Sequence, residues 1–338
     1  MDKREMLLHS LDGLHLLDKA EKADVVGDLL GLQAQFARNP EISLMLRATD
    51  YDAGTWQDGL VKVWTHRGTI HVIREAELGL FLSAVGCVGA FTDSWNGLTV
   101  KDQETWYPFI QNEIAKGNDT RDGLKAACER AGMGEELMGR VFYGWGGLIK
   151  EMALRGLLAG APGMEKRYLV PKNVAFMERD EARRVLIQRY CASFGPATVE
   201  DCAFFFGYVH KPMRDLIRQV VKDMPSVVVD GKIYYYNRVL SENLRLPECV
   251  LLPGFDQLVM GYRDRSRFLD EKHAKKLTNV AGIVFPAVIL RGKVRAKWKW
   301  DEKCATITPF EPLSEHAREV IARTFMRKLK KEVRFAEE

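Results

Sequence analysis

A β-hairpin directly after a helix is the feature that most constrains how this chain folds. Ser226–Tyr236 alternates around Asp230-Gly231, and an Asp-Gly pair between two alternating segments is a strong hairpin signal. The segment before it, Lys211–Val221, has helical spacing and the position of a recognition helix. Helices followed by such a hairpin are typical of a winged-helix unit.

The same order of elements recurs earlier in the chain. Val61–Ile73 is predicted to form two short strands around His66-Arg67-Gly68, and a basic, strand-like piece lies at Lys166–Lys172. The expected helices are Asp2–Leu17, Lys22–Gln35, Glu41–Thr49, a short one from its N-cap Thr55 to about Leu60, Glu75–Gly86, Gln103–Lys116, Thr120–Ala131, Glu135–Leu158, Arg179–Ala192 and one capped by Thr198. We therefore expect three tandem winged-helix units, over residues 1–74, 75–173 and 174–246.

The composition changes to strands after Pro247. The β-rich segments are Val250–Leu252, Ile283–Leu290, Lys293–Trp300 and Ala305–Phe310, with a tight turn at Arg291-Gly292. A final helix is expected from its cap Ser314 to about Lys331. We expect residues 247–338 to form a small β-barrel-like domain or curled sheet closed by this helix, so the fold class is mainly α with β (α+β).

The length of the chain fits several compact units, and its charge distribution fits contact with a polyanion. The 338 residues are 46% hydrophobic and 28% charged, and no apolar run approaches the roughly 18 residues of a membrane span. The net charge of +4 is unevenly spread, because residues 257–338 hold 19 Lys and Arg against 11 Asp and Glu. This positive end suits phosphate contact, although a solvated basic helix is the simpler interpretation of Arg327–Lys331 alone.

The six cysteines include no Cys-x-x-Cys pair. That spacing argues against a zinc site and for reduced core thiols in a cytoplasmic protein.

Two uncharged amides, Gln33 and Gln35, stand one residue apart just before Asn39-Pro40. An apolar helical run leads into them, and Asn-Pro favours a turn, so we expect both glutamines at or near a helix C-terminus. Residues i and i+2 of a helix do not share a face, so both side chains reach one pocket only if the helix loosens there. On residue chemistry alone, two polar residues that face water are the simpler interpretation.

Two further blocks change this weighting. Val63–Ile73 contains Thr-His-Arg-Gly-Thr-Ile-His, and Leu251–Leu269 begins Leu-Leu-Pro-Gly-Phe-Asp-Gln. Together with Gly31–Gln35, in this order and at these separations, they resemble the AlkZ-like bacterial DNA glycosylases, which are winged-helix proteins that excise alkylated purines. The resemblance runs from about Met6 to about Arg327.

The resemblance implies that Gln33 and Gln35 are catalytic, because the family assigns its Gln-x-Gln pair to positioning water near the anomeric carbon. A neutral amide is a poor general base, but it can orient a water through its carbonyl oxygen and donate through its NH₂. That is enough when the bond is already weak, as in a purine that carries a fixed positive charge after alkylation at N7 or N3. The related YcaQ branch has an aspartate at the position of Gln35.

The family also implies a concave DNA-binding channel and a hairpin that probes the duplex. By position the probing loop is Glu271–Gly282, and the alternative is an ordinary solvated loop. Its predicted DNA contacts are Lys272, Lys275 and Lys276 to phosphates and Leu277 as a wedge in a groove. We expect a monomer without metal or organic cofactor, in the cytoplasm at the bacterial nucleoid, that acts on double-stranded DNA with alkylated purines.

His66, Arg67 and His71 carry the second block and are predicted to border the glutamine pocket and meet the sugar-phosphate backbone. The alternative is that they satisfy each other and the turn.

Asp256 is the one carboxylate in apolar surroundings. We expect it to form a structural ion pair with Arg263 or Arg265, with a catalytic acid/base role as the alternative. Arg263, Arg265 and Arg267 alternate, so an extended segment would present them on one face to phosphates, and a structural ion-pair network is equally compatible.

Two departures from the family pattern bear on substrate range. Val63–His66 is bulkier than usual, and Ile283–Pro286 replaces a more basic run. The alternative function is a non-enzymatic winged-helix DNA-binding protein or transcriptional regulator, which has no need of two amides beneath a hairpin. An RNA-binding or toxin-associated role has no support beyond the basic end.

Overall fold

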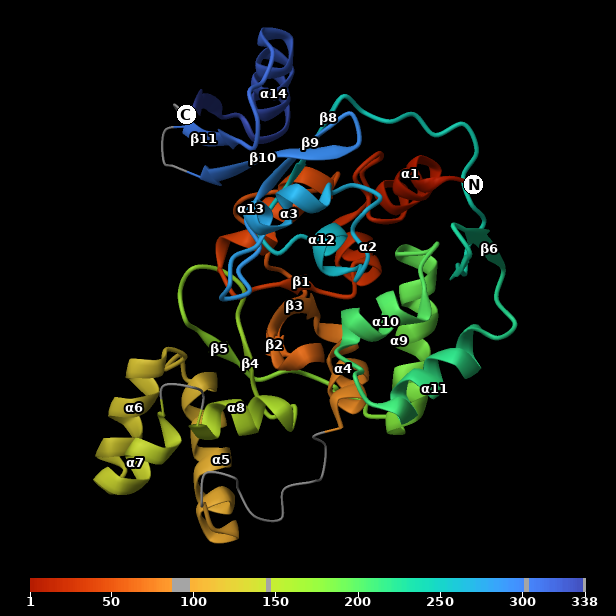
Figure 1. Ribbon diagram of the computed structural model, residues 1–338. Helices are drawn as coiled ribbons and strands as arrows, with labels where there is room; N and C mark the ends of the chain where they lie inside the picture. Colours follow the sequence, from red (N-terminus) through yellow and green to blue (C-terminus); the bar gives the residue numbers. More distant parts are fainter. Residues whose placement is uncertain (87–97, 144–146, 301–303, 337–338) are drawn as a thin grey trace. The chain divides into compact units, whose positions relative to one another are not determined.

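The computed structural model describes residues 1–86, 98–143, 147–300 and 304–336 of a mixed α+β chain (Figure 1). The chain divides into two compact units. The first consists of Met1–Gln33, Asn39–Trp56 and Arg184–Glu338, and the second of Ala34–Arg38 and Gln57–Arg183. Each unit is described by itself below.

Helices at the N-terminal end of the first unit begin where the sequence offers a cap. The side chain of Asp2 accepts hydrogen bonds from the backbone N–H groups of Arg4 and Glu5, and the side chain of Glu5 accepts one from the backbone N–H of Asp2. Together these bonds form a capping box at the start of α1. The described helices of this unit, in chain order, are α1 (Lys3–Gly13), α2 (Lys22–Asp28), α3 (Arg38–Arg47), α9 (Arg179–Ser193, which starts in the second unit), α10 (Val199–Phe206), α11 (Lys211–Val221), α12 (Gln257–Met260), α13 (Ala274–Leu277) and α14 (Glu315–Leu329).

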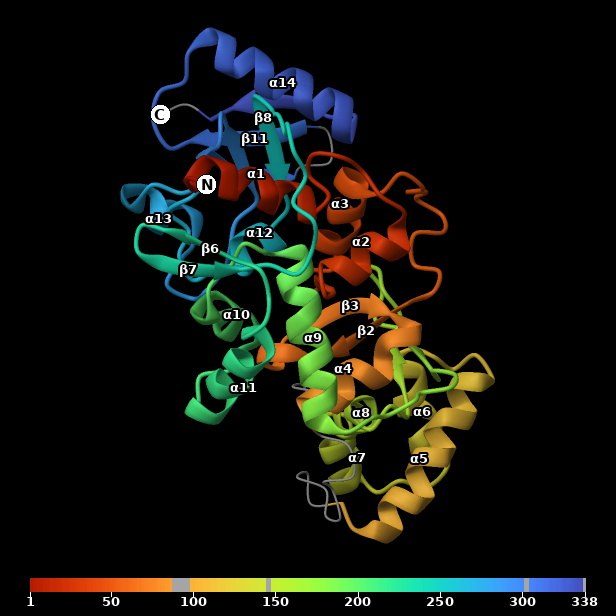
Figure 2. The same ribbon diagram turned by 90° about the vertical axis from the view of Figure 1, so that its right-hand side faces the viewer.

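The C-terminal part of the first unit is a five-stranded sheet in the order β12-β11-β10-β9-β8. Its strands are β8 (Cys249–Leu252), β9 (Ala287–Leu290), β10 (Lys293–Trp300), β11 (Cys304–Pro309) and β12 (Glu332–Phe335), and all neighbours are antiparallel except β11 and β12. Helix α14 lies along this sheet (Figure 2). Trp298 packs edge-on against Phe325, with ring centroids 5.2 Å apart, so the helix and sheet share one core.

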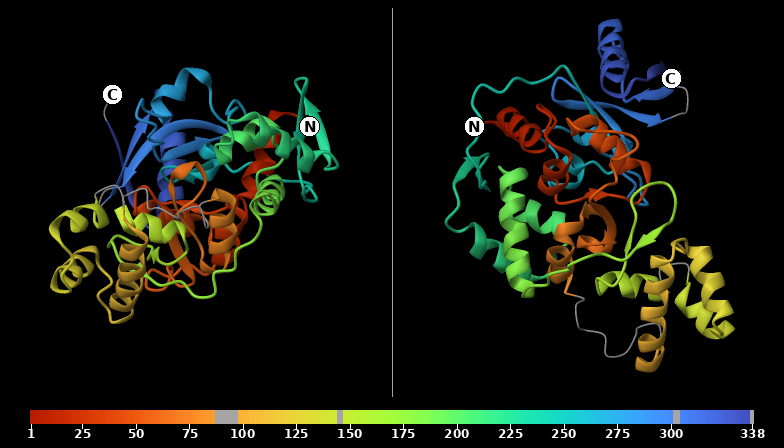
Figure 3. Two further views of the ribbon diagram at one scale, coloured as in Figure 1. Left: turned by 90° about the horizontal axis from the view of Figure 1, so that it is seen from below. Right: turned by 180° about the vertical axis from the view of Figure 1, so that it is seen from behind.

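The second unit holds the hairpin β2 (Leu60–Trp64) and β3 (Ile70–Arg74), extended by the short strands β4 (Ala159–Gly160) and β5 (Tyr168–Leu169). Its helices are α4 (Leu78–Val85), α5 (Val100–Ala115), α6 (Arg121–Arg130), α7 (Glu135–Val141) and α8 (Gly147–Leu154). Helices α5 to α8 pack consecutively and stand together as the yellow group in Figure 3.

Local signals in the sequence predicted most elements well. The hairpin of β6 (Ser226–Val229) and β7 (Lys232–Tyr235) turns at Asp230-Gly231, and α10 and α14 begin at the caps Thr198 and Ser314. Four of the six expected core thiols are buried, whereas Cys304 is partly exposed and Cys87 lies outside the described residues. Burial raises the pKa of Cys128 and Cys191 to about 12, that of Cys249 to about 11 and that of Cys202 well above its usual value.

The predicted helix Lys22–Gln35 begins where expected, but its predicted end was wrong. Helix α2 ends at Asp28, because Leu30 and Gly31 adopt positive φ values of 54° and 91° and reverse the chain into the short extended strand β1 (Leu32–Gln33). Asn39-Pro40 is not a stop signal either. It lies in the first turn of α3, where a proline costs no intrahelical hydrogen bond.

Other boundaries also differ from the prediction. Thr55 caps no helix, since residues 53–59 form hydrogen-bonded turns around Asp52. The single helix expected over Glu135–Leu158 is two helices, α7 and α8, with residues 144–146 between them outside the described part. In the strand-like piece Lys166–Lys172, only Tyr168–Leu169 forms a strand, and Arg167 adds an isolated bridge to Thr120.

Close packing in the second unit makes a testable prediction about a helical glycine. A Cβ at Gly79 in α4 would lie 1.9 Å from the carbonyl oxygen of Ala175, so Gly79→Ala should lower the free energy of unfolding by about 1–3 kcal/mol despite the better helix propensity of alanine. The control is Gly139 in α7, where nothing lies within 4 Å. Gly139→Ala should raise stability by about 0.5–1 kcal/mol. Equal effects of the two substitutions in urea unfolding would contradict this packing.

Candidate functional site

The glutamine segment is not helical, which removes the objection that a helix would separate the two side chains. Gln33 ends β1 and is 6% exposed, whereas Gln35 is exposed in the bend that follows. Between them the backbone N–H of Ala34 donates to the carbonyl of Ile70 at the start of β3, over 2.8 Å. The strand ends at Gln33 and the chain bends at Gln35, so the two amides leave the backbone in a buried and an exposed position.

One short segment holds the chain on both sides of the glutamines. The side-chain Nε2 of Gln257 donates to the carbonyl of Gly31, two residues before Gln33. Gly254 lies against the other end, where a Cβ would be 3.1 Å from the side-chain amide of Asn39. Residues 253–257 therefore fix the start and the end of the loop that carries Gln33 and Gln35.

Asp256 lies at the centre of that segment and is paired, as expected for a buried acid, but not with the predicted partners. Its Oδ2 is 2.8 Å from Nη2 of Arg47 on α3, and both side chains are fully buried. Its Oδ1 accepts from the backbone N–H of Leu258 and caps α12. Both oxygens are thus engaged in structural contacts, which favours the structural ion pair over the acid/base alternative.

The other side-chain nitrogens of Arg47 also form buried hydrogen bonds. Its Nε donates to the carbonyl of Leu14 over 2.9 Å, and its Nη1 donates to Ser43 Oγ over 3.1 Å. The guanidinium therefore joins α3, α12 and the segment after α1, and satisfies the buried carboxylate with geometry that neither Arg263 nor Arg265 provides.

The histidine block lies in the β2–β3 hairpin, with a 3₁₀ turn at His66–Gly68 and Arg67 at φ 57°. The rings of His66 and His71 are 4.2 Å apart, and Thr65 Oγ1 is 2.8 Å from Nδ1 of His71. Burial lowers the pKa of His66 well below its usual value and that of His71 to about 3, so both are neutral at pH 7.

The alternative, in which the two histidines satisfy each other and the turn, holds only in part. The Nδ1 atom of each ring lies within 3.4 Å of Thr65 Oγ1, but the buried Nε2 atom of His71 has no hydrogen-bond partner among the described residues. His71 is fully buried and His66 is 7% exposed, so neither presents a charged ring to a phosphate. Burial also lowers the pKa of Arg67 to about 10, which leaves its guanidinium charged at neutral pH. Arg67 is the cation at the turn of this hairpin.

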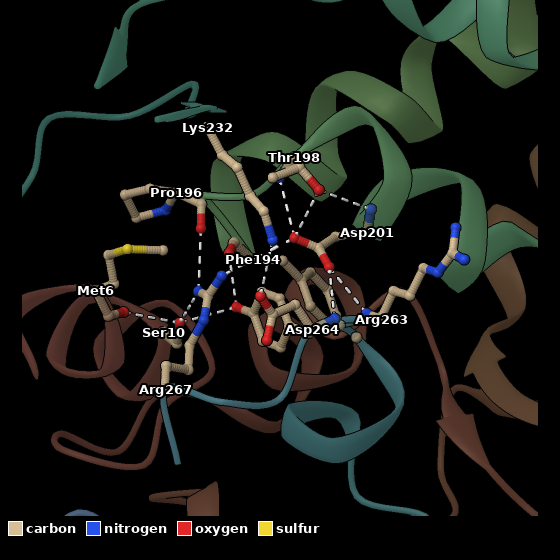
Figure 4. Close-up of polar contacts among 12 residues, drawn as sticks. Met6, Ser10, Phe194, Pro196, Thr198, Asp201, Lys232, Arg263, Asp264 and Arg267 are labelled. Carbon is tan, nitrogen blue, oxygen red and sulfur yellow. Dashed lines mark hydrogen bonds and ion pairs between the residues drawn. The ribbon is translucent and has the colours of Figure 1, made fainter. Parts of the chain in front are cut away.

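The three arginines do not form the predicted row. The backbone N–H groups of Arg263 and Asp264 both donate to Asp201 Oδ1, which turns the chain instead of extending it (Figure 4). Arg267 is 4% exposed, donates to Ser10 Oγ and the carbonyl of Pro196, and lies 4.1 Å from the ring centroid of Tyr262. Its role is structural.

The other two arginines differ from Arg267 and from each other. Arg265 is half-buried, and its Nε donates to the carbonyl of Val259. Arg263 has an exposed side chain that extends away from Asp201 in Figure 4. Of the predicted row, Arg263 is the member best placed to meet a phosphate.

The predicted probing loop contains two short helices, a 3₁₀ turn at Glu271–His273 and α13. Leu277 ends α13 and is fully buried, so its prediction as a wedge was wrong. Lys272 pairs with Glu311, and Lys276 donates to the carbonyl of Phe310 over 2.5 Å, whereas Lys275 is exposed.

The exposed tip of this predicted loop lies at Asn279–Gly282, where no contact residue was predicted from the sequence. Thr278 and Val284 pair across it, and the backbone N–H of Gly282 donates to the carbonyl of Asn279. The side chain of Val280 is fully exposed at this tip. The signal was present as β-branched residues on both sides of Asn279-Val280-Ala281-Gly282.

The model of the family "DNA glycosylase AlkZ-like" matches residues 26–330. The chain belongs to the AlkZ-like DNA glycosylase family. It is 28% identical over 317 residues to a Streptomyces sahachiroi protein named an interstrand DNA cross-link repair glycosylase, with 85% of this chain and 84% of that protein covered. It is also similar to the solved structure of Streptomyces sahachiroi DNA glycosylase AlkZ, with a TM-score of 0.76, 26% identity and coverage of 99% and 100% of the two chains.

Family membership identifies the chain as a DNA repair glycosylase of this type, with DNA as its substrate. Among its described residues, no helix combines the length and the apolar character that crossing a bilayer requires.

The buried histidines make a prediction about pH and stability. Because their pKa values are lowered on folding, the unfolded chain takes up protons below about pH 6.5 that the folded chain does not, and stability falls as the pH falls. Each ring contributes a slope of up to about 1.4 kcal/mol per pH unit in that window.

His71→Gln should therefore flatten the fall in unfolding free energy between pH 6.5 and 5, as measured by urea unfolding. His316→Gln is the matched control, because that imidazole is exposed. The same slope in both variants would show that the buried ring does not resist protonation.

Proposed function

We propose that this chain is a monofunctional DNA glycosylase that hydrolyses the N-glycosidic bond of purines alkylated at N7 or N3 in duplex DNA, with Gln33 and Gln35 orienting the attacking water. The observation that carries the proposal is the short segment after Gly31, in which Gln33 ends β1 and Gln35 follows in a bend. Gln257 binds the carbonyl at its start, and Gly254 lies close to Asn39 beyond its end.

The chemistry asked of the two amides is modest. An alkylated purine already carries the positive charge that makes it a leaving group, so no strong acid is needed. A fixed amide oxygen that accepts a hydrogen bond from water holds that water in line with the anomeric carbon, and this positioning is the main contribution. Asp256 is occupied by Arg47, which is consistent with a reaction that uses no carboxylate here.

We extend the substrate range to bulky adducts and interstrand cross-links. The Streptomyces sahachiroi relative is named for cross-link repair, and a site that probes the duplex from outside need not enclose the whole base. The exposed Val280 tip supplies an apolar wedge in place of Leu277. We retain Arg67, Arg263 and Lys275 as phosphate contacts, and give the neutral His66 and His71 a supporting role.

The scaffold we propose consists of winged-helix units over residues 1–74, 75–173 and 174–246, followed by a barrel-like domain around a concave channel. The hairpins β2–β3 and β6–β7, each after helices, and the five-stranded sheet beside α14 support this division. We also propose that the protein acts as a monomer in the cytoplasm, at the nucleoid.

The test of the function is release of base from duplex DNA with a single N7-methylguanine. Wild-type protein should release the base, and Gln33→Ala/Gln35→Ala should lower the single-turnover rate by about 100-fold or more with DNA affinity retained. A duplex with one cross-link gives the second substrate.

Two outcomes would contradict the proposal. Unchanged release by the double variant would remove the glutamines from the mechanism. No release from either duplex, together with sequence-selective binding, would identify a DNA-binding regulator that has kept the family's fold.

The exposed tip gives an independent prediction. Val280→Asp should lower the rate of base release at least tenfold at subsaturating DNA, because it places a charge and a hydrated group where an apolar side chain enters a groove. Its matched control is Val239→Asp, at another exposed valine outside this tip. Both variants should keep the thermal stability of the wild type, and an equal loss of rate in both would mean that added negative charge alone weakens DNA binding.

A further inference from the structure

A pocket of about 450 Å³ lies in the first unit, where the segment after α1 meets α3, β8 and α14. None of its lining residues belongs to the glutamine segment or to the exposed tip. Its volume falls within the range of roughly 300–1,000 Å³ that small-molecule sites occupy. The proposed function leaves this pocket unused.

The floor of the pocket consists of buried apolar side chains. Leu16, Leu46 and Leu251 line it with relative exposures of 8%, 5% and 2%, and all three belong to elements of the core. Cys249 and Val250 complete this surface from β8. A hydrocarbon or ring of a ligand would replace water against these side chains.

The rim carries three cations, Lys19, Arg327 and Lys328, and no acidic residue lines the pocket. Within the described ranges, none of the three forms an ion pair. Lys19 is held in place because its Nζ donates to the carbonyls of Met45 and Ala48, both over 3.0 Å, which leaves one of its three N–H donors for a ligand.

The cations repel one another at this rim. Burial lowers the pKa of Lys328, and Lys19 and Arg327 lower it further, while Asp18 acts in the opposite direction. An anion in the pocket would relieve this repulsion and satisfy the unused donors, as an apolar floor alone could not.

We propose that this pocket binds a small organic anion. A phosphate or carboxylate head would accept hydrogen bonds from Lys19, Arg327 and Lys328, and an apolar body would lie on the leucine floor.

Two simpler explanations account for only part of the arrangement of these cations. Helix C-termini attract cations. This explains why Arg327 and Lys328 lie at the end of α14 and why Lys19 donates to carbonyls at the end of α3. It does not explain why all three line one apolar pocket that no acidic residue lines. A DNA backbone would fit an exposed basic ridge, because a phosphodiester has no apolar body to fill the floor.

The test uses the full-length protein and calorimetric titration with n-octyl phosphate and with octanoate, each below its micelle concentration, and with inorganic phosphate as the head alone. We expect at least one amphiphile to bind at least tenfold more tightly than inorganic phosphate. The preferred head then distinguishes a phosphate from a carboxylate ligand. Lys328→Gln and Arg327→Gln should each weaken this binding about tenfold.

Arg323→Gln is the matched control, an exposed arginine on the same helix that does not line the pocket, and it should bind like the wild type. The proposal is overturned if neither amphiphile binds at millimolar concentration, if inorganic phosphate binds as tightly, or if Arg323→Gln weakens binding equally. Displacement of the amphiphile by undamaged duplex DNA would also overturn it, and would assign these cations to the DNA backbone. None of these outcomes depends on base release, so failure here is distinct from failure of the proposed function.

Discussion

The buried pair of Arg47 and Asp256 is the interaction on which the geometry around the glutamines depends. Removing two charged groups from water costs free energy. The pair is stabilised here because the other side-chain nitrogens of Arg47 bind Leu14 and Ser43, and the other oxygen of Asp256 binds the first turn of α12. The pair fixes α12 relative to α3, and α12 begins with Gln257, which holds the carbonyl of Gly31. A contact between residues 209 positions apart thereby determines where a two-residue strand begins.

The division between what the sequence predicted and what it did not follows the range of the interactions. Caps and tight turns are set by neighbours along the chain, so Thr198, Ser314 and Asp230-Gly231 could be read correctly. The end of α2 depends on backbone angles that a leucine rarely adopts, and Leu30 carries no sequence mark of a positive φ. The partner of Asp256 and the burial of Leu277 depend on tertiary packing, so neither could be predicted from local pattern.

For the candidate site, the family motif identified which residues matter, and burial decides what each can do. His66 and His71 cannot carry charge where they lie, and Arg267 is enclosed by Tyr262 and Ser10. Positive charge that can reach a phosphate is left on a few exposed side chains, such as Arg263 and Lys275. In this chain the predicted site residues thus separate into a buried set, which includes His66, His71 and Arg267, and a smaller exposed set, which includes Arg263 and Lys275.

The buried cysteines have a consequence for a protein whose substrate is chemically damaged DNA. The thiolate is the form of cysteine that reacts with electrophiles, and burial keeps Cys128, Cys191, Cys202 and Cys249 protonated far above neutral pH. Agents that alkylate purines also attack sulfur. By enclosing these nucleophiles, the fold limits its own chemical inactivation under the very conditions in which such a repair enzyme is needed.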